Sequence, residues 1–211
     1  MNAIDEYLFE LKSTLDRLPH EVIQQVVEML HNARMYNHQV FIMGNGGSAS
    51  TASHFVCDLG KNTRVKGIPN FKVMGLTDNM AMFSALANDE GYENVFAQQL
   101  ANHIEPGDIV IGISTSGNSP NVVNAIELAN SVQAKTIGLT GFSSGKLANM
   151  LDIDLNVPSE SVERVEDIHL VLEHLICKAL RERAIEMAVL GGSITVVSEV
   201  ELDKEISDEN Y

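Results

Sequence analysis

Four hydroxyl-bearing side chains lie within six residues near the middle of the chain. They are Ser114, Thr115, Ser116 and Ser119, and Pro120 comes directly after them. Proline favours the first position of a helix, so the segment is expected to end at a helix N-terminus. Hydroxyl groups, free N–H donors and the positive end of a helix dipole bind an anion without any lysine. One serine is enough to cap a helix, so four hydroxyls predict a phosphate-binding loop, here called the serine loop (residues 114–119).

A glycine-rich segment earlier in the chain has a related chemistry. It reads Gly44-Asn45-Gly46-Gly47-Ser48 and is called the glycine loop. Glycine allows positive φ and lets backbone N–H groups approach an anion closely. The dinucleotide fingerprint G-x-G-x-x-G fails because Ala49 occupies the last glycine position, and no Gly-Lys-Ser/Thr of a Walker loop follows. The segment therefore predicts a ligand-binding loop of another kind.

Ionisable residues recur at helical spacing in two places. His54 and Asp58 are four residues apart, so they share one face of a helix. A second group lies on a long helical segment near the C-terminus: Glu166, Asp167, His169, Glu173 and His174. Asp167 is nearly aligned with His174, whereas Glu166 lies about 80° around the helix axis from it. Spacing by itself therefore favours Asp167 as the partner of His174.

Both loops join a short apolar segment to a helical one, and this alternation runs through the chain. The predicted strands are residues 40–43, 71–76, 109–113, 136–140 and 153–157; the predicted helices between and after them are 49–59, 80–87, 95–104, 122–132 and 161–187. Short apolar strands alternating with helices indicate a parallel sheet covered on both faces. We predict an α/β protein, a three-layer αβα sandwich around a five-stranded parallel sheet. Ligands of such sheets bind beyond the carboxyl ends of the strands, where both loops lie.

Two amphipathic segments precede the first strand and are predicted to be helices. We place N-terminal helices at residues 1–37, the α/β domain at 38–188 and an acidic C-terminal arm at 189–211. Gly191-Gly192 is expected to break the preceding helix. The arm then has strand character at 194–197 and carries six acids against one lysine from Glu199 to Tyr211. A solvated or disordered end is the first interpretation, and a partner-binding tail is the second.

Composition limits the function classes. The chain has 211 residues, with 14 Lys and Arg against 29 Asp and Glu, a net charge of −15. Affinity for nucleic acid comes largely from Lys and Arg on phosphates, so nucleic acid is not an expected partner. No apolar run is long enough for a membrane span, and the N-terminus does not resemble a secretion signal. The two cysteines, Cys57 and Cys177, cannot build a disulfide framework, so a cytoplasmic location is expected, with Cys57 a buried small residue.

Several of these blocks, taken in order, resemble the sugar isomerase (SIS) family, and most closely its phosphoheptose isomerases. The matching blocks are the glycine loop, His54-Phe55, Ala87 to Tyr92, Gly107-Asp108, Ile113 to Ser119, Leu139-Thr140-Gly141 and Ile168-His169. They cover roughly residues 5 to 185 and leave out the C-terminal arm. The resemblance implies the SIS fold, a homotetramer with active sites between subunits, and a phosphosugar as the small-molecule partner.

The resemblance also implies roles for individual residues. The serine loop, through Ser114, Thr115, Ser116 and Ser119, would hold the phosphate. The sugar would be lined by Asn45, Gly46, Gly47, Ser48, Asn88 and Asp89. A divalent metal ion, zinc by expectation, would be bound by His54, Asp58, Glu166 and His174. The family pattern thus selects Glu166, where spacing favours Asp167.

This sequence departs from the family pattern at two of the four metal positions. The family has His, Glu, Gln and His, whereas this chain has Asp58 for the glutamate and Glu166 for the glutamine. Two imidazoles and two carboxylates still suit a zinc or similar divalent site. Asp58 and Glu166 are candidate bases and His174 the candidate acid.

The predicted function is an aldose–ketose isomerase of sedoheptulose 7-phosphate type, working by metal-assisted proton transfer through an enediol-like intermediate. The alternative is a phosphosugar-binding or regulatory SIS protein that acts through protein contacts without catalysis. Asp58, one methylene shorter than glutamate, motivates this alternative, because a base must lie within about 3 Å of the proton it removes. A bound metal would separate the two hypotheses.

Overall fold

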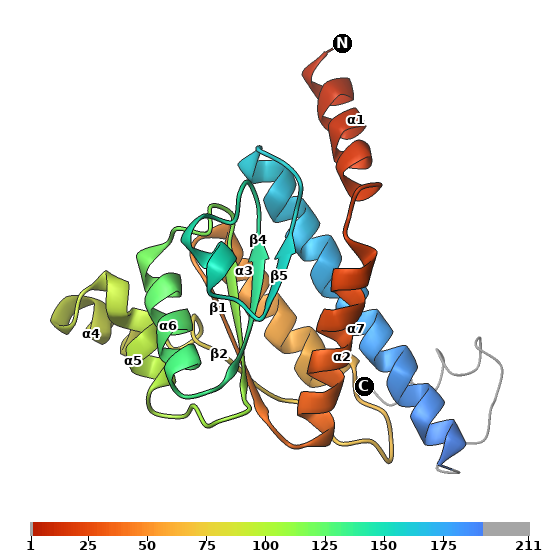
Figure 1. Cartoon of the computed structure of the whole chain (residues 1–211), viewed down its shortest axis with the longest axis vertical. Coiled ribbons are helices and arrows are strands. Elements are labelled where there is room, and N and C mark those ends of the chain that lie inside the picture. The colour runs from red at the N-terminus through yellow and green to blue at the C-terminus, as the bar shows by residue number, and fades with distance from the viewer. Residues whose placement is uncertain (1, 192–211) are drawn as a thin grey trace.

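The computed structural model describes residues 2–191, and its centre is a five-stranded sheet (Figure 1). The strands are β1 (Gln39–Gly44), β2 (Lys72–Gly75), β3 (Ile109–Ser114), β4 (Lys135–Thr140) and β5 (Ile153–Asn156). They are all parallel and follow the order β2-β1-β3-β4-β5. The predicted sheet is confirmed, and each strand lies within two residues of its predicted bounds.

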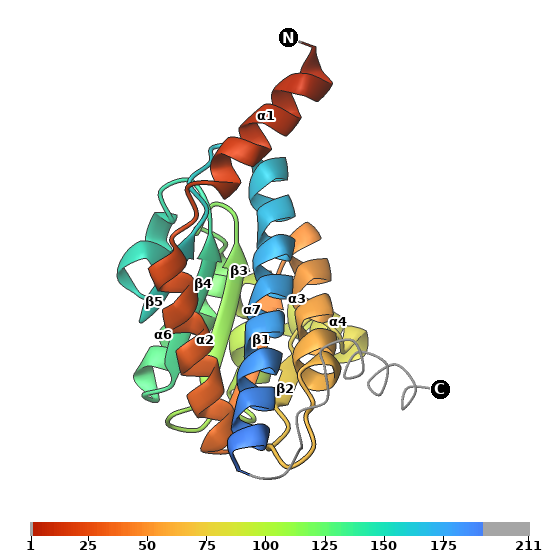
Figure 2. The ribbon, with the colours of Figure 1, turned by 90° about the vertical axis from the view of Figure 1, so that its right-hand side faces the viewer.

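Helices cover both faces of the sheet, as a parallel sheet requires. One layer contains α2 (His20–Met35), α3 (Gly47–Cys57) and α7 (Val162–Leu190). The other contains α4 (Met80–Asp89), α5 (Val95–Leu100) and α6 (Pro120–Ser131). Figure 2 shows α2, α7 and α3 side by side on their face. The predicted three-layer αβα sandwich is confirmed.

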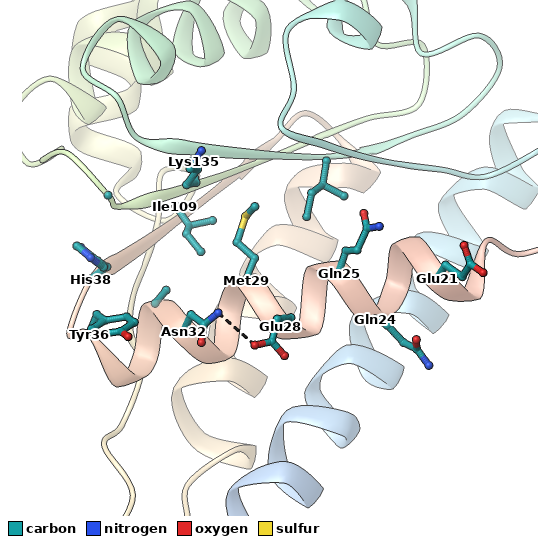
Figure 3. Close-up of a pocket in the computed structure, with 13 residues that line it drawn as sticks. Glu21, Gln24, Gln25, Glu28, Met29, Asn32, Tyr36, His38, Ile109 and Lys135 are labelled. Carbon is teal, nitrogen blue, oxygen red and sulfur yellow. Dashed lines mark hydrogen bonds between the residues drawn. The ribbon is translucent and has the colours of Figure 1, made fainter.

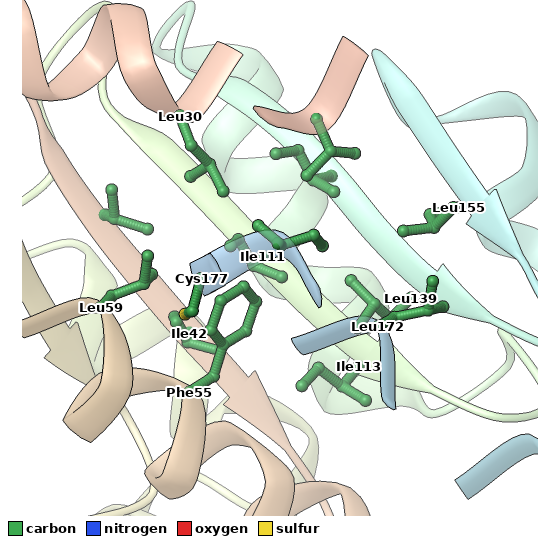
Figure 4. Close-up of a cluster of buried hydrophobic side chains, with 14 of the residues drawn as sticks. Leu30, Ile42, Phe55, Leu59, Ile111, Ile113, Leu139, Leu155, Leu172 and Cys177 are labelled. Atoms are coloured by element: carbon green, nitrogen blue, oxygen red, sulfur yellow. The ribbon is translucent and has the colours of Figure 1, made fainter. Parts of the chain in front are cut away.

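The apolar residues of the central strands divide between two cores because successive side chains point to opposite faces. Ile42 and Ile111 pack with Phe55 of α3 and Leu172 of α7 under the first helical layer (Figure 4). Phe41 and Val110 pack with the second layer. Burial on both sides explains why these strands read as unbroken apolar runs in the sequence.

The first helix, α1 (Ala3–Leu15), extends beyond the body of the sandwich (Figures 1 and 2). The Asn2 side chain caps its N-terminus by accepting a hydrogen bond from the Asp5 N–H at 3.0 Å. Two side-chain contacts join α1 to α7: the Tyr7 hydroxyl donates to Asp167 at 2.5 Å, and the Arg164 guanidinium donates to the Glu10 carboxylate. The contact with Asp167 raises the pKa of Tyr7 to about 12, because the hydrogen bond and the negative charge of Asp167 oppose loss of the proton.

Three local differences from the sequence prediction concern helix ends. The helix after the glycine loop ends at Cys57 and continues as one π-helical turn, Asp58–Asn62. The helix predicted to reach residue 104 ends at Leu100, and short 3₁₀ segments occur at Tyr92–Asn94 and Gly145–Asn149. The C-terminal helix continues past its predicted end to Leu190. The predicted strand character at 194–197 and most of the acidic arm lie outside the described residues.

Among the helices of residues 2–191, none combines the length and the apolar composition needed to cross a membrane.

Candidate active site

The glycine loop and the serine loop lie next to each other at the carboxyl edge of the sheet. Gly44, the last residue of β1, pairs with Ile113 of β3, so the loops that follow both strands leave the sheet side by side. The strand order reverses between these two strands, which is where open α/β sheets bind their ligands. The topology therefore places the two loops side by side at the carboxyl edge of the sheet.

The hydroxyl groups of the serine loop make no capping hydrogen bonds to the helix that follows. Ser119 is the N-cap of α6, yet its side chain makes no capping hydrogen bond, and Pro120 occupies the first turn. The Ser119 hydroxyl instead lies 3.1 Å from the Ser114 hydroxyl. The Ser116 hydroxyl accepts from the Asn118 N–H at 3.2 Å. Ordinary N-cap chemistry thus does not account for this loop, and its hydroxyl groups remain close to the N-terminus of α6.

Gly117 fixes the path of the serine loop. Its φ is 63°, and a Cβ built on it would lie 1.8 Å from the carbonyl oxygen of Ser144. Its carbonyl oxygen accepts a hydrogen bond from the Leu147 N–H at 3.2 Å. No side chain fits here, so the serine loop is packed directly against the backbone that follows β4.

The glycine loop is joined to the helix of the serine loop by two amides. The side chains of Asn45 and Asn121 exchange hydrogen bonds, each 2.9 Å long. The Tyr92 hydroxyl donates to the same Asn45 oxygen at 2.9 Å. Sequence reasoning did not single out Asn121 or Tyr92 as site residues. Their signals were the position of Asn121 in the first turn of a loop-bearing helix and the place of Tyr92 in a family block.

The remaining sugar-site residues have different environments. Gly46 has a φ of 57° and open space where a Cβ would stand. Ser48 is buried in the first turn of α3. Asn88 and Asp89 end α4, are exposed, and bond to each other at 2.7 Å. They precede Tyr92 closely in the chain, and Tyr92 is the contact between this region and Asn45.

Four ionisable side chains converge where α3 and its π-helical turn pack against α7. They are His54, Asp58, Glu173 and His174, with one ligand atom from each lying within 4.8 Å of the others. The two histidine Nε2 atoms are 3.3 Å apart. Asp58 oxygens lie 3.8 Å from His54 Nε2 and 4.0 Å from His174 Nε2. We call these four residues the carboxylate–histidine cluster.

Asp58 is held in the cluster by its position in the π-helical turn, a feature frequent at functional sites. Its carboxylate is nearly buried and accepts a hydrogen bond from the Asn62 side chain at 2.7 Å. Glu173, on α7, is fully buried. Burial, and then the negative charge of Asp58, raise the pKa of Glu173 to about 8, because both disfavour a second carboxylate there.

Asp167 and Glu166, the two α7 residues that the sequence offered as partners of His174, lie in different surroundings. The Asp167 carboxylate bonds to Tyr7 and so faces α1. The Glu166 carboxylate lies beside Gly47, where a built Cβ would meet it at 2.6 Å, and it is outside the carboxylate–histidine cluster. Eight residues of helix span about 12 Å along the axis, which is why Glu166 and His174 reach different parts of the site. Glu173, adjacent to His174, joins the cluster instead.

The donor set of the cluster fits a divalent metal ion. Zinc binds imidazole nitrogen at about 2.0–2.1 Å, which puts two nitrogens of a tetrahedral site about 3.3 Å apart. His54 Nε2 and His174 Nε2 are 3.3 Å apart. Two neutral imidazoles and two carboxylates also offer two negative charges to a doubly charged ion. His54, Asp58 and His174 from the predicted ligand set therefore come together with Glu173.

Cys57, Cys177 and His169 differ in their exposure to solvent. Cys57 is exposed, so the prediction that it is buried is wrong; α3 ends at this residue, and its side chain faces solvent. Cys177 is buried in the core beneath the cluster, next to Phe55 (Figure 4). Burial raises the pKa of the Cys177 thiol. His169 is also buried and donates from Nε2 to the Thr140 carbonyl at 3.0 Å, and burial lowers its pKa to about 4.

A cavity of about 880 Å³ lies elsewhere in the described chain. Figure 3 shows Gln25 and Met29 of α2 facing Ile109 and Lys135 at the starts of β3 and β4. This groove is therefore at the amino edge of the sheet, opposite the two loops. Ligands of open α/β sheets bind at the carboxyl edge, so we place the chemistry at the loops and the cluster.

Fold and site define an α/β protein with a hydroxyl-rich loop at the switch point of its sheet and a nearby cluster of side chains that could hold a metal ion. The model of the SIS domain matches residues 6–141. Phosphoheptose isomerase of Aliarcobacter butzleri is 38% identical over 84% of this chain and 92% of its own length. The Helicobacter pylori (strain P12) enzyme is 37% identical over 81% and 88%.

Comparison with solved structures points to the same family. Phosphoheptose isomerase from Neisseria gonorrhoeae superposes with a TM-score of 0.79 and 30% identity, covering 85% of this chain and 97% of its own. The Francisella tularensis structure gives a TM-score of 0.77 and 30% identity, covering 86% and 100%. This chain belongs to the SIS domain family and, within it, to the phosphoheptose isomerases.

Proposed function

We propose that this protein is an aldose–ketose isomerase that interconverts a ketose phosphate and an aldose phosphate of sedoheptulose 7-phosphate type, with a divalent metal ion. The relatives named above, at 37–38% identity over most of both chains, support the activity and the substrate class. The observation that carries the metal-assisted chemistry is the convergence of His54, Asp58 and His174.

Phosphate recognition is assigned to the serine loop. Ser114, Thr115, Ser116 and Ser119 would surround the phosphate at the N-terminus of α6, where the helix dipole favours an anion. The rest of the sugar would extend along the glycine loop, past Asn45, Gly46, Gly47 and Ser48, with Asn88 and Asp89 at its far side. The Asn45–Asn121–Tyr92 hydrogen bonds would keep the two loops at a fixed separation.

Proton transfer is assigned to the carboxylates and to His174. Isomerisation removes a proton next to the carbonyl and returns one to the neighbouring carbon. Asp58 and Glu166 are the candidate bases: Asp58 is nearly buried in the cluster, and Glu166 lies beside the glycine loop. His174 is about half exposed and is the candidate acid. A bound ion would polarise the carbonyl and hydroxyl oxygens of the sugar as a Lewis acid.

Zinc is the proposed ion, held by His54, Asp58 and His174, with a carboxylate of α7 as the fourth ligand; the sequence pattern assigns Glu166 to that place. We also propose a homotetramer, supported by the exposed apolar side chains of Ile4, Leu8 and Phe9 on the protruding helix α1. A cytoplasmic location is part of the same proposal.

The experiment joins metal analysis to an activity assay. The purified full chain is analysed by elemental mass spectrometry and then given sedoheptulose 7-phosphate, with the product followed by NMR. Stoichiometric zinc together with turnover is expected. Retained phosphosugar binding without metal and without turnover would overturn the proposal and favour a regulatory SIS protein. The substitution of Asp for the family glutamate at residue 58 motivates that second outcome.

A further inference from the structure

Glu173 is a carboxylate in an apolar place. It lies on the buried face of α7, where its helical neighbours His169, Leu172, Ile176 and Cys177 are all buried. The side chain of Glu173 is 0% exposed. Burying a charged group costs several kcal/mol unless it is paired, so the ionised form of Glu173 is favoured here only with a cation beside it, and otherwise the side chain keeps its proton.

The partners that residues 2–191 offer to Glu173 satisfy only one of its oxygens. Oε1 accepts a weak hydrogen bond from the Cys177 thiol at 3.8 Å. Oε2 is buried and accepts no hydrogen bond from a donor group of the described residues, and the neighbouring acidic group is the Asp58 carboxylate. This oxygen lies 3.4 Å from His174 Nε2, on the side of the carboxylate–histidine cluster. Cys177 thus fixes one oxygen and leaves the other directed into the cluster.

Solvent and ions can reach the cluster. A cavity of about 150 Å³ adjoins it and is lined by Asp58, Asn62, His174, Cys177, Lys178 and Arg181. About 10–15 Å³ of such space is enough for one water molecule, so the cavity has room for several water molecules beside the cluster. The cluster therefore joins a buried donor, Glu173, to an open side where His54 and His174 are partly exposed.

We propose that Glu173 is the fourth protein ligand of the metal ion, in the place that the sequence pattern gives to Glu166. This inference rests on the proposed function, since it concerns the same ion. Glu173 and Asp58 would together neutralise the charge of a divalent cation, and His54 and His174 would complete the set. Glu166, beside Gly47, would then serve the sugar end of the site.

The test compares Glu173→Leu with Glu166→Leu, two matched changes on one helix. Zinc affinity is measured by competition with a coloured chelator, and the visible spectrum is recorded after loading with Co²⁺. Loss of an outer partner of a metal ligand already lowers affinity about 10–100-fold, so Glu173→Leu is expected to lower it about 100-fold or more. Its Co²⁺ spectrum should change. Glu166→Leu should retain zinc affinity within about threefold and keep the wild-type spectrum.

Thermal unfolding separates a ligand from a structural residue. Leucine suits the apolar surroundings of residue 173, so metal-free Glu173→Leu should unfold at a higher temperature than metal-free wild type, and zinc should no longer stabilise it. A merely structural glutamate would give a less stable metal-free variant with zinc stabilisation intact. If Glu173→Leu does not fold, Glu173→Gln is measured in its place, with an expected loss of zinc affinity of about tenfold or more.

The outcomes for the inference and for the proposed function differ. The inference would be overturned if Glu173→Leu bound zinc as tightly as wild type, or if Glu166→Leu lost as much zinc affinity as Glu173→Leu. In either case a wild-type protein that binds zinc and is active would leave the proposed function standing. A wild-type protein that binds neither zinc nor Co²⁺ would overturn both.

Discussion

His54 Nε2 and His174 Nε2 lie 3.3 Å apart, although 120 residues separate the two histidines in the chain. Their helices make this possible. Gly47 at the start of α3 lies beside Glu166 of α7, and His54 and His174 meet seven and eight residues further on. The two helices therefore run in the same direction, side by side, for about 10–12 Å. One end of this pair faces the loops, and the other end carries the cluster.

The first prediction concerns His174. His174→Ala removes the candidate acid and a proposed metal ligand together. It is expected to lower kcat about 100-fold or more, because general acid–base groups alone contribute about 10²–10⁴-fold, while KM for the phosphosugar changes less than about threefold. Steady-state kinetics on the zinc-loaded protein measure both. His20→Ala, at an exposed histidine at the start of α2, is the control and should behave as wild type. Equal activity in His174→Ala would contradict the assignment.

The second prediction concerns the backbone of the serine loop. Gly117→Ala places a methyl group against the Ser144 carbonyl at a positive φ, so the loop must move. The free energy of unfolding should fall by about 2 kcal/mol or more, and KM should rise because the phosphate hydroxyls are displaced. The control is Gly60→Ala, at a glycine without positive φ and with ordinary space for a Cβ. Urea unfolding measures the free energy of unfolding, and steady-state kinetics measure KM. If Gly117→Ala and Gly60→Ala gave the same values of both, Gly117 would not fix the path of the serine loop.

The third prediction concerns the hydrogen bond between Tyr92 and Asn45. Tyr92→Phe removes a donor from the amide that joins the two loops. One hydrogen bond is worth about 1 kcal/mol, so kcat/KM should fall about fivefold if the energy is lost in the substrate complex. Tyr36→Phe is the matched control, since Tyr36 is 75% exposed at the end of α2. A Tyr92→Phe protein with wild-type kcat/KM would show that this contact does not position the loop.

The fourth prediction concerns acid stability. Burial lowers the pKa of His169 to about 4, from 6.5 in the unfolded chain. Between these values the unfolded chain binds a proton that the folded protein does not. The free energy of unfolding must therefore fall as pH drops from about 6.5 to 4, by up to about 3 kcal/mol for this group. His169→Gln should flatten that slope.

The acid-stability measurement is urea unfolding of both proteins at pH 7 and pH 5, with a chelator present so that metal release does not contribute. The difference between the two proteins isolates His169 from other groups that titrate in this range. The same slope in both would mean that His169 is protonated in the folded protein.

The sheet was predictable because its signal is local. Strands such as residues 109–113 are continuous apolar runs, and only burial on both faces of a parallel sheet favours that pattern. The strand-to-helix loops were predictable for the same reason: glycines, hydroxyls and proline mark where a strand ends and a helix begins. Helix ends were less predictable. The π-helical turn at Asp58–Asn62 depends on packing against α7, which no local pattern reports.

The sequence by itself determined the fold class, the two loops and the presence of histidines and carboxylates on two helices. Only the tertiary structure decided which of them meet. Helical spacing orders residues around one axis, so it favoured Asp167 as the partner of His174. It contains no information on which side chains a second helix brings close. Packing of α3 against α7 turned Asp167 toward Tyr7, left Glu166 beside Gly47 and brought Glu173 to the histidines. Convergence of this kind depends on the separation between helices, a quantity that no single helix encodes.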